Sequence, residues 1–240
     1  MDVIGFAGPM GSGKDTAASS IARRKATVIV ALADPLKRMA TEWFGIPHDN
    51  VWGTLEQKNA PLATPIDAQA LAHAKTFADK LVALTRGEKS EAEVLAAMDA
   101  AFLPHLPIRT ARKLMQEIGT GLGRSLSPDL WLMSLHDVLR ALRHGAAYTR
   151  QGGIDLQRGA LHTYDVTAVP DVRFPNEAKY IKEVLGGSVV WIESGARVAR
   201  PEGFAHASEP TYEALAPWVT HVVKNETTVE DFEEALRVAV

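Results

Sequence analysis

The sequence predicts an α/β fold of three layers, in which helices cover both faces of a parallel sheet. A short apolar run at residues 3–6 is followed by a glycine-rich segment and an alanine-rich helical stretch. Further strand-like runs alternate with helical segments in both the first and the last part of the chain. The length of 240 residues suits one α/β domain that carries an insertion.

The first part of the chain begins with a strand at 3–6, a glycine-rich loop and a helix at 14–24. A second strand is expected at 27–33, where Asp34 can cap a helix that has Pro35 in its first position. Residues 54–107 are rich in alanine and show no strand signals, so they read as a helical insertion. Within it, Ser90 and Glu93 form a capping box.

Helices at 109–123 and 128–143 follow the alanine-rich stretch, and the second opens at Ser127-Pro128-Asp129. Residues 150–159 are rich in glycine and glutamine and are expected to form a loop. The last part predicts three more strands and two more helices. The strands are expected at 164–169, 188–193 and 218–223, and the helices at 175–185 and 228–239.

Composition narrows the classes of function. Apolar residues make up 46% and charged residues 23%, and no apolar run is long enough to span a membrane. The N-terminus lacks the pattern of a secretory signal, which predicts a cytoplasmic protein. The absence of cysteine excludes disulfides and thiolate metal sites. With a net charge of −3 and no basic stripe, we expect no nucleic-acid partner and no membrane partner.

The glycine-rich segment matches the first seven positions of the Walker A pattern between a strand and a helix. Its backbone N–H groups and the helix N-terminus suit the phosphates of ATP, while a lysine reaches the β/γ bridge. The ATP-binding candidates are Gly8, Gly11, Ser12, Gly13, Lys14, Asp15 and Thr16. The eighth position is normally Ser or Thr on Mg²⁺ but here is Asp15, so Asp15 and Thr16 are both candidate metal ligands. The alternative to a nucleotide site is a glycine turn that merely caps a helix.

A second segment with candidate site residues, 169–177, follows the strand expected at 164–169. It is therefore expected at the carboxyl edge of the sheet, where ligands of such sheets bind. Asp171 can hold Mg²⁺ through water, and Arg173 can brace phosphates bidentately. Lys14, Asp171 and Arg173 are therefore the catalytic candidates. Alternatively, Asp171 caps the next turn and Arg173 pairs with Glu177.

The helix expected from Arg109 places Arg109, Arg112, Gln116 and Thr120 on one face. This cationic, hydrogen-bonding strip suits a nucleoside monophosphate, although a solvated basic face explains it equally well. Asp34 and Lys37 also fall at a strand's carboxyl edge, and capping explains Asp34 as well as function does.

Two segments near the C-terminus could contact ATP. Residues 194–210 have the composition of a lid, with Arg197 as a phosphate ligand, but an ordinary surface loop would look the same. The loop after the last strand carries Asn225, where the backbone could meet adenine or simply cap a helix.

Taken together, these motifs resemble the bacteriophage-type deoxynucleoside monophosphate kinases of the P-loop nucleotide kinase family. The matching segments are residues 5–16 with the ending Gly-Lys-Asp-Thr, 33–37, 112–120, Gly123-Arg124, Asp129-Leu130-Trp131, 171–177 and 206–209. The resemblance implies a transferase that uses ATP and Mg²⁺ to phosphorylate a deoxynucleoside monophosphate, in the host cytoplasm if phage-encoded. It implies a single kinase domain with an acceptor-binding insertion at about 54–145, and leaves a homodimer open. The acceptor-binding candidates are Asp34, Lys37, Arg109, Arg112, Gln116, Arg124, Asp129, Trp131 and Glu177.

Other functions fit the same phosphate loop. A kinase of another small metabolite, such as dephospho-coenzyme A or phosphomevalonate, would use the same scaffold. A P-loop ATPase that switches a partner or moves DNA would be expected to carry a basic surface or a water-positioning residue after the strand, and the acidic chain shows no basic patch. A module that only binds nucleotide is the third alternative.

Overall fold

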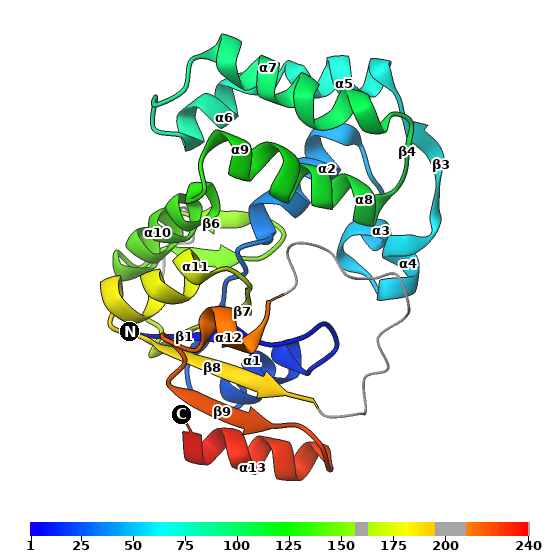
Figure 1. Cartoon of the computed structure of the whole chain (residues 1–240). Coiled ribbons are helices and arrows are strands. Elements are labelled where there is room, and N and C mark those ends of the chain that lie inside the picture. Colours follow the sequence, from blue (N-terminus) through cyan, green and yellow to red (C-terminus); the bar gives the residue numbers. More distant parts are fainter. Residues whose placement is uncertain (157–162, 195–209, 240) are drawn as a thin grey trace. The chain divides into compact units, whose positions relative to one another are not determined.

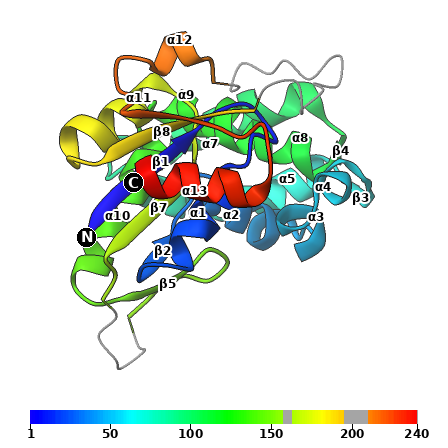
Figure 2. The same cartoon turned by 90° about the horizontal axis from the view of Figure 1, so that it is seen from below.

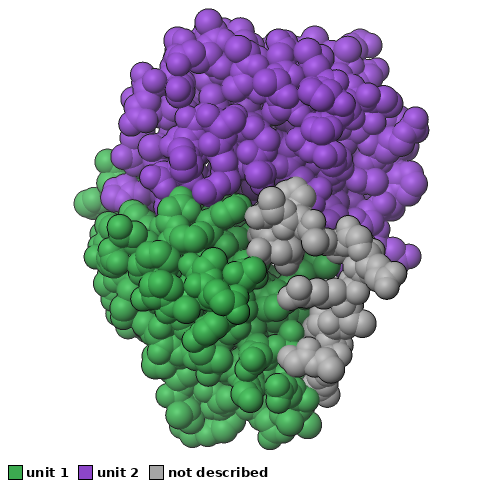
Figure 3. Space-filling model, in the orientation of Figure 1, with its two compact units in different colours: residues 1–32, 137–240 green, residues 33–136 purple. Residues whose placement is uncertain are grey.

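The structure, a computed structural model, describes residues 1–156, 163–194 and 210–239. The chain forms two compact units, drawn in different colours in Figure 3. Unit 1 contains residues 1–32 and 137–240, and unit 2 contains residues 33–136. Within the described ranges, every helix is too short or too polar to cross a membrane.

Unit 1 is built on a five-stranded sheet in the order β2-β7-β1-β8-β9, and each neighbouring pair is parallel. This confirms the expected parallel sheet flanked by helices (Figure 1). The chain runs from β1 to one side of the sheet and later returns to the other, so β1 marks the topological switch point where α/β sheets bind ligands. The elements are β1 (Asp2–Ala7), α1 (Lys14–Ala22), β2 (Thr27–Ile29), β5 (Ala147–Thr149), β6 (Gly153–Asp155), β7 (Val166–Val172), α11 (Pro175–Lys179), the π-helical turn η3 (Tyr180–Val184), β8 (Ser188–Glu193), α12 (Tyr212–Leu215), β9 (His221–Lys224) and α13 (Val229–Ala239).

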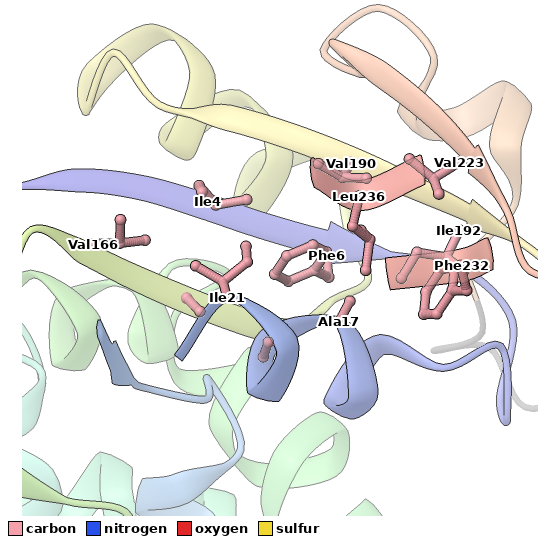
Figure 4. Packing of buried hydrophobic residues seen from close by; sticks show 12 residues of the cluster. Ile4, Phe6, Ala17, Ile21, Val166, Val190, Ile192, Val223, Phe232 and Leu236 are labelled. Atoms are coloured by element: carbon pink, nitrogen blue, oxygen red, sulfur yellow. The ribbon is translucent and has the colours of Figure 1, made fainter. Parts of the chain in front are cut away.

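One face of the sheet packs on α1 and α13 (Figure 4). Side chains alternate along a strand, so Ile4 and Phe6 of β1 point into this layer together. They meet Ile21 of α1 and Phe232 of α13, and all four are buried. Truncating a buried aromatic such as Phe6 to alanine typically costs about 3–5 kcal/mol, so this layer fixes α1 and the loop before it.

The opposite face is covered by α11 and η3; α11 and α13 lie on opposite sides of the sheet in Figures 1 and 2. Gly5 of β1 makes this close approach possible. A Cβ atom at Gly5 would lie 2.7 Å from the Cδ1 atom of Ile181 in η3 and 2.9 Å from a methyl group of Val172. A larger residue at position 5 would therefore push η3 away from the sheet.

Unit 2 is mainly helical and contains two pairs of packed aromatic rings. Trp43 stacks on Phe77, and Phe44 contacts Phe102. The capping box of Ser90 is present as expected. The elements are α2 (Asp34–Phe44), α3 (His48–Trp52), α4 (Leu55–Asn59), β3 (Pro61–Ile66), α5 (Ala68–Lys75), α6 (Ala78–Leu84), α7 (Glu91–Phe102), the short 3₁₀ turn η1 (Leu103–His105), β4 (Ile108–Thr110), α8 (Ala111–Gln116), the π-helical segment η2 (Glu117–Gly123) and α9 (Arg124–Leu126). The next helix, α10 (Leu130–Arg143), continues from unit 2 into unit 1.

Two expectations about strands were wrong. The stretch 54–107 contains β3, which pairs antiparallel with β4. Its prolines, Pro61 and Pro65, hide the strand signal, and its partner is a distant segment of the chain. The stretch 150–159 is not all loop, because β6 pairs with β5 in a hairpin.

Several boundaries also differ. The second strand ends at Ile29 rather than 33, although the N–H of Val30 still donates to the carbonyl of Ala168. The strand expected at 164–169 instead continues to Val172. The last strand begins at His221 rather than 218. Strand ends depend on the neighbouring strand, which local sequence does not encode.

Candidate active site

The phosphate loop lies between β1 and α1, as the Walker A pattern predicted. Gly8, Gly11 and Gly13 have φ angles of 145°, 78° and 101°, in the region that side chains disfavour. Space at Gly8 is also closed, because a Cβ atom there would lie 2.5 Å from the carbonyl oxygen of Ile192. The loop that leads into α1 therefore requires glycine for its shape.

Lys14 is half-buried and folds back on its own loop. Its Nζ atom donates to the carbonyl oxygens of Gly8 at 2.8 Å and Pro9 at 2.6 Å. The N-cap of α1 is Gly13, which supplies no side-chain cap. A helix N-terminus with a lysine beside it favours negative charge, so this end of α1 suits an anionic phosphate group.

Asn225, in the loop after β9, is a brace for the phosphate loop. Its Nδ2 atom donates to the carbonyl oxygen of Ser12 at 2.9 Å, while its backbone N–H donates to the backbone carbonyl oxygen of Glu193 at 2.7 Å. A Cβ atom at Gly13 would come within 2.6 Å of the same Nδ2 atom. The expected contact of this loop's backbone with adenine stays a prediction, and the contact of the Asn225 side chain with the phosphate loop was not foreseen.

Asp171 lies inside β7 rather than after it. Its Oδ1 atom accepts a hydrogen bond from the N–H of Leu32 at 2.8 Å, which joins the chain after β2 to β7. Pairing of β7 with β1 is irregular around Asp171, between Val169 and Val172, where Pro170 cannot donate to the sheet. The half-buried carboxylate of Asp171 is thus at the carboxyl end of β7, as expected.

Glu177 is buried, and it holds the chain that carries Arg173. Its Oε2 atom accepts from the backbone N–H of Arg173 at 2.7 Å and of Phe174 at 3.0 Å. The alternative of an ion pair between the side chains of Arg173 and Glu177 stays a prediction, because these hydrogen bonds come from the backbone. The side chain of Arg173 is exposed. Both residues lie in unit 1, beyond the carboxyl end of β7.

Asp15 lies in the first turn of α1 and is 83% exposed. Its Oδ1 atom is 3.7 Å from Nη1 of Arg150, which the β5–β6 hairpin carries. Sequence reasoning missed Arg150, because the hairpin read as a loop. The Gly152-Gly153 pair after it was the signal that could have revealed a hairpin turn.

The donors present fit Mg²⁺. This ion keeps several waters and needs only one or two carboxylates from a protein. Asp15 and Thr16 are exposed at the N-terminus of α1, and Asp171 is half-buried. Among the described residues, no three His, Cys, Asp or Glu side chains are grouped as a metal cluster, which an ion bound mainly by water and phosphate does not require.

In unit 2, Asp34 is completely buried as the first residue of α2. The expectation that it caps this helix was wrong, since Ala33 is the N-cap and Pro35 is the second helical residue. A buried carboxylate in the first turn is favoured by the helix dipole. Lys37, one turn later, lies with its Nζ atom 4.8 Å from the ring centroid of Trp52.

The predicted strip on the next helix is shorter than expected. Arg109 lies in β4, because Thr110 is the N-cap of α8 and its Oγ1 atom accepts from Lys113. The expectation that Arg109 shares a helix face was therefore wrong. Thr120 lies in η2, where wider turns change the spacing of the face. Arg112 and Gln116 remain on α8, four residues apart and half-buried.

Of the remaining acceptor candidates, Trp131 is buried against η2, and its Nε1 atom donates to the carbonyl of Gly119 at 2.9 Å. Arg124 begins α9 and is half-buried, and Asp129 is exposed just before α10. Arg197 and the lid-like stretch 195–209 lie outside the described residues.

No family model matches this chain. It is 28% identical over 232 residues to a protein of Acanthamoeba polyphaga mimivirus named "Putative deoxynucleotide monophosphate kinase". The aligned region covers 97% of this chain and 92% of the viral protein, so both units fall within it. The similarity therefore extends over nearly the whole of both chains.

Proposed function

We propose that the protein transfers the γ-phosphoryl group of ATP to a deoxynucleoside monophosphate and releases a diphosphate. The observation that carries this proposal is the phosphate loop at the switch point of the sheet, with Lys14 held over it by Gly8 and Pro9. The name of the mimivirus protein supports the choice of acceptor. It agrees with the resemblance that the motifs of the sequence suggested.

The donor is bound in unit 1. The N–H groups of the loop and the N-terminus of α1 would hold the β-phosphate, and Lys14 would exchange its carbonyl partners for phosphate oxygens. Asp15, Thr16 and Asp171 are the residues that would hold Mg²⁺, which neutralises charge on the phosphates when bound. Arg173, on a backbone fixed by Glu177, would stabilise charge on the transferred group.

The acceptor is assigned to unit 2. Arg112 would bind its phosphate, and Gln116, one turn along α8, would read an edge of the base. The attacking group is already an anionic phosphate oxygen, so the reaction needs positioning and charge neutralisation rather than a general base. Aspartate, lysine and arginine side chains are sufficient for this chemistry.

A coupled assay of ADP release tests the proposal. It should compare the four canonical deoxynucleoside monophosphates, their ribo counterparts, dephospho-coenzyme A and phosphomevalonate, with the Lys14→Ala variant as the inactive control. We expect turnover that depends strictly on an added deoxynucleoside monophosphate. ADP release without any acceptor would instead indicate an ATPase switch, and release only with another metabolite would reassign the acceptor.

A further inference from the structure

Arg150 occupies a defined position next to the phosphate loop. It follows β5 in a hairpin whose register pairs Thr149 with Gly153. The Oγ1 atom of Thr149 accepts from the N–H of Gly152 at 3.0 Å, and Gly153 has a φ angle of 75°. These features close the turn tightly, so the position of Arg150 is set by the hairpin.

The charges of Arg150 and Asp15 face each other at the N-terminus of α1. Their nearest atoms are 3.7 Å apart, and the Arg150 side chain is 32% exposed while that of Asp15 is 83% exposed. Asp15 occupies the Walker position that normally holds an uncharged hydroxyl. A carboxylate there repels a triphosphate, and a guanidinium beside it offsets that repulsion.

We propose that Arg150 binds the γ-phosphate of the donor nucleotide and that Asp15 positions it; this inference rests on the proposed function. The residue at position 15 directly follows the lysine that, in the Walker pattern, reaches the β/γ bridge of the nucleotide, so a group beside it lies at the γ-phosphate end of the loop. A guanidinium held there is close to the terminal phosphate and can bind two of its oxygens at once. The hairpin thereby supplies an arginine that the phosphate loop lacks.

Titration calorimetry with ATP and ADP, with EDTA and then with Mg²⁺, tests the contact. For Arg150→Ala we expect the Kd for ATP to rise roughly tenfold to a hundredfold and that for ADP to change less than about twofold. Arg150→Lys should fall between, since it keeps the charge and loses the fork. Equal effects on ATP and ADP, or no effect on ATP, would overturn the assignment.

The matched control is Arg23→Ala, because Arg23 caps the other end of α1 and pairs with Glu233. It should leave both Kd values unchanged, and thermal unfolding should show that each variant is folded. Wild-type protein that binds neither nucleotide would contradict the proposed function itself. Wild-type activity with an unaffected Arg150→Ala variant would contradict only the role of Arg150.

A double-mutant cycle tests the part played by Asp15. In EDTA, the loss of ATP affinity caused by Arg150→Ala should shrink several-fold when Asp15 is already Asn, because the arginine is then no longer held in place. EDTA removes any contribution of Asp15 as a metal ligand. The same loss in both backgrounds would show that Asp15 does not position Arg150.

Discussion

The ammonium group of Lys14 donates to two carbonyl groups of its own loop, and binding of a phosphate would replace these bonds. We expect Lys14→Ala to lower kcat about a hundredfold or more, since charge on the transferred group is then uncompensated. The free energy of unfolding should fall by only about 1 kcal/mol, which denaturant titration can measure. Lys182→Ala, an exposed lysine on η3, is the control, and comparable losses in both variants would contradict the assignment.

Asn225 makes a second prediction, about the shape of the loop. Asn225→Ala removes the bond to the carbonyl of Ser12, so affinity for ATP and ADP should fall together by roughly tenfold. Asn225→Asp should be worse, because a carboxylate cannot donate to that carbonyl and repels phosphate. Calorimetry with both nucleotides checks this, and unchanged affinity in the aspartate variant would show that the brace is dispensable.

Sequence alone predicted that the glycine-rich segment joins the first strand to the first helix, because Gly8 to Thr16 are contiguous and the signal is local. It missed Arg150, whose contact with Asp15 joins segments far apart in the chain. It assigned Trp131 to the acceptor through a resemblance, and this stays a prediction; it did not foresee that the indole is buried and donates to Gly119. A residue type does not reveal which atoms a side chain will meet.

Among the elements, α7 begins with a capping box whose effect depends on pH. The backbone N–H of Ser90, followed by its hydroxyl and by Lys89, lowers the pKa of Glu93. A lowered pKa in the folded state means that the cap stabilises above the pKa of the unfolded chain and is lost as pH falls through that of the folded protein. NMR titration should show the Glu93 pKa rising toward its ordinary value in Ser90→Ala.

The same Ser90→Ala variant should lower the Tm by a few degrees near neutral pH, with a smaller difference from wild type below the pKa of Glu93. Ser90→Thr is the matched control, because its hydroxyl can still accept from the N–H of Glu93. A Tm difference that stays constant down to acidic pH would mean that Glu93 contributes nothing to the cap.

The π-helical segment η2 packs on Trp131. A Cβ atom at Gly123 would lie 2.2 Å from the Cζ2 atom of Trp131, so we expect Gly123→Ala to destabilise the protein by about 1–3 kcal/mol. Trp131→Phe removes the hydrogen bond to Gly119 but leaves more space beside Gly123. Gly123→Ala should therefore lower the free energy of unfolding less in the Trp131→Phe background than in wild type. Denaturant unfolding of the four proteins measures the coupling, and additive effects would show that the ring is not the obstacle.

Elements with strong local signals were predicted well, such as the capped helix at Ser90 and the strand at the phosphate loop. The β3–β4 pair was missed. Pro61 and Pro65 weaken the strand signal of β3, and the strand forms because it pairs with β4. The change from α to π geometry at Glu117 was missed too. Tertiary contacts decide the pairing of β3 with β4.

Over the whole molecule, the proposed function assigns the donor to unit 1 and the acceptor to unit 2. Arg112→Ala should therefore reduce kcat/KM for the monophosphate roughly tenfold to a hundredfold and leave the Kd for ATP nearly unchanged. Steady-state kinetics with each substrate varied checks it, with Arg143→Ala, an exposed arginine at the end of α10, as control. Equal losses for ATP and the monophosphate would contradict this division.

Gln116→Ala should act differently from Arg112→Ala. An amide can read the edge of a base but adds no charge, so the ranking among the four deoxynucleoside monophosphates should change more than the rate with the best of them. Competition assays with paired acceptors measure the ranking. An unchanged ranking would remove Gln116 from base recognition.

The strand order has a consequence for folding during translation. β1 is made first, yet its neighbours in the sheet, β7 and β8, are made only after all of unit 2, so Ile4 must wait for Ala168 to emerge. Unit 2 is one continuous segment and can fold while translation continues. The apolar strand that carries the phosphate loop therefore lacks its sheet neighbours until unit 2 has been made, an exposure of the kind that chaperones bind.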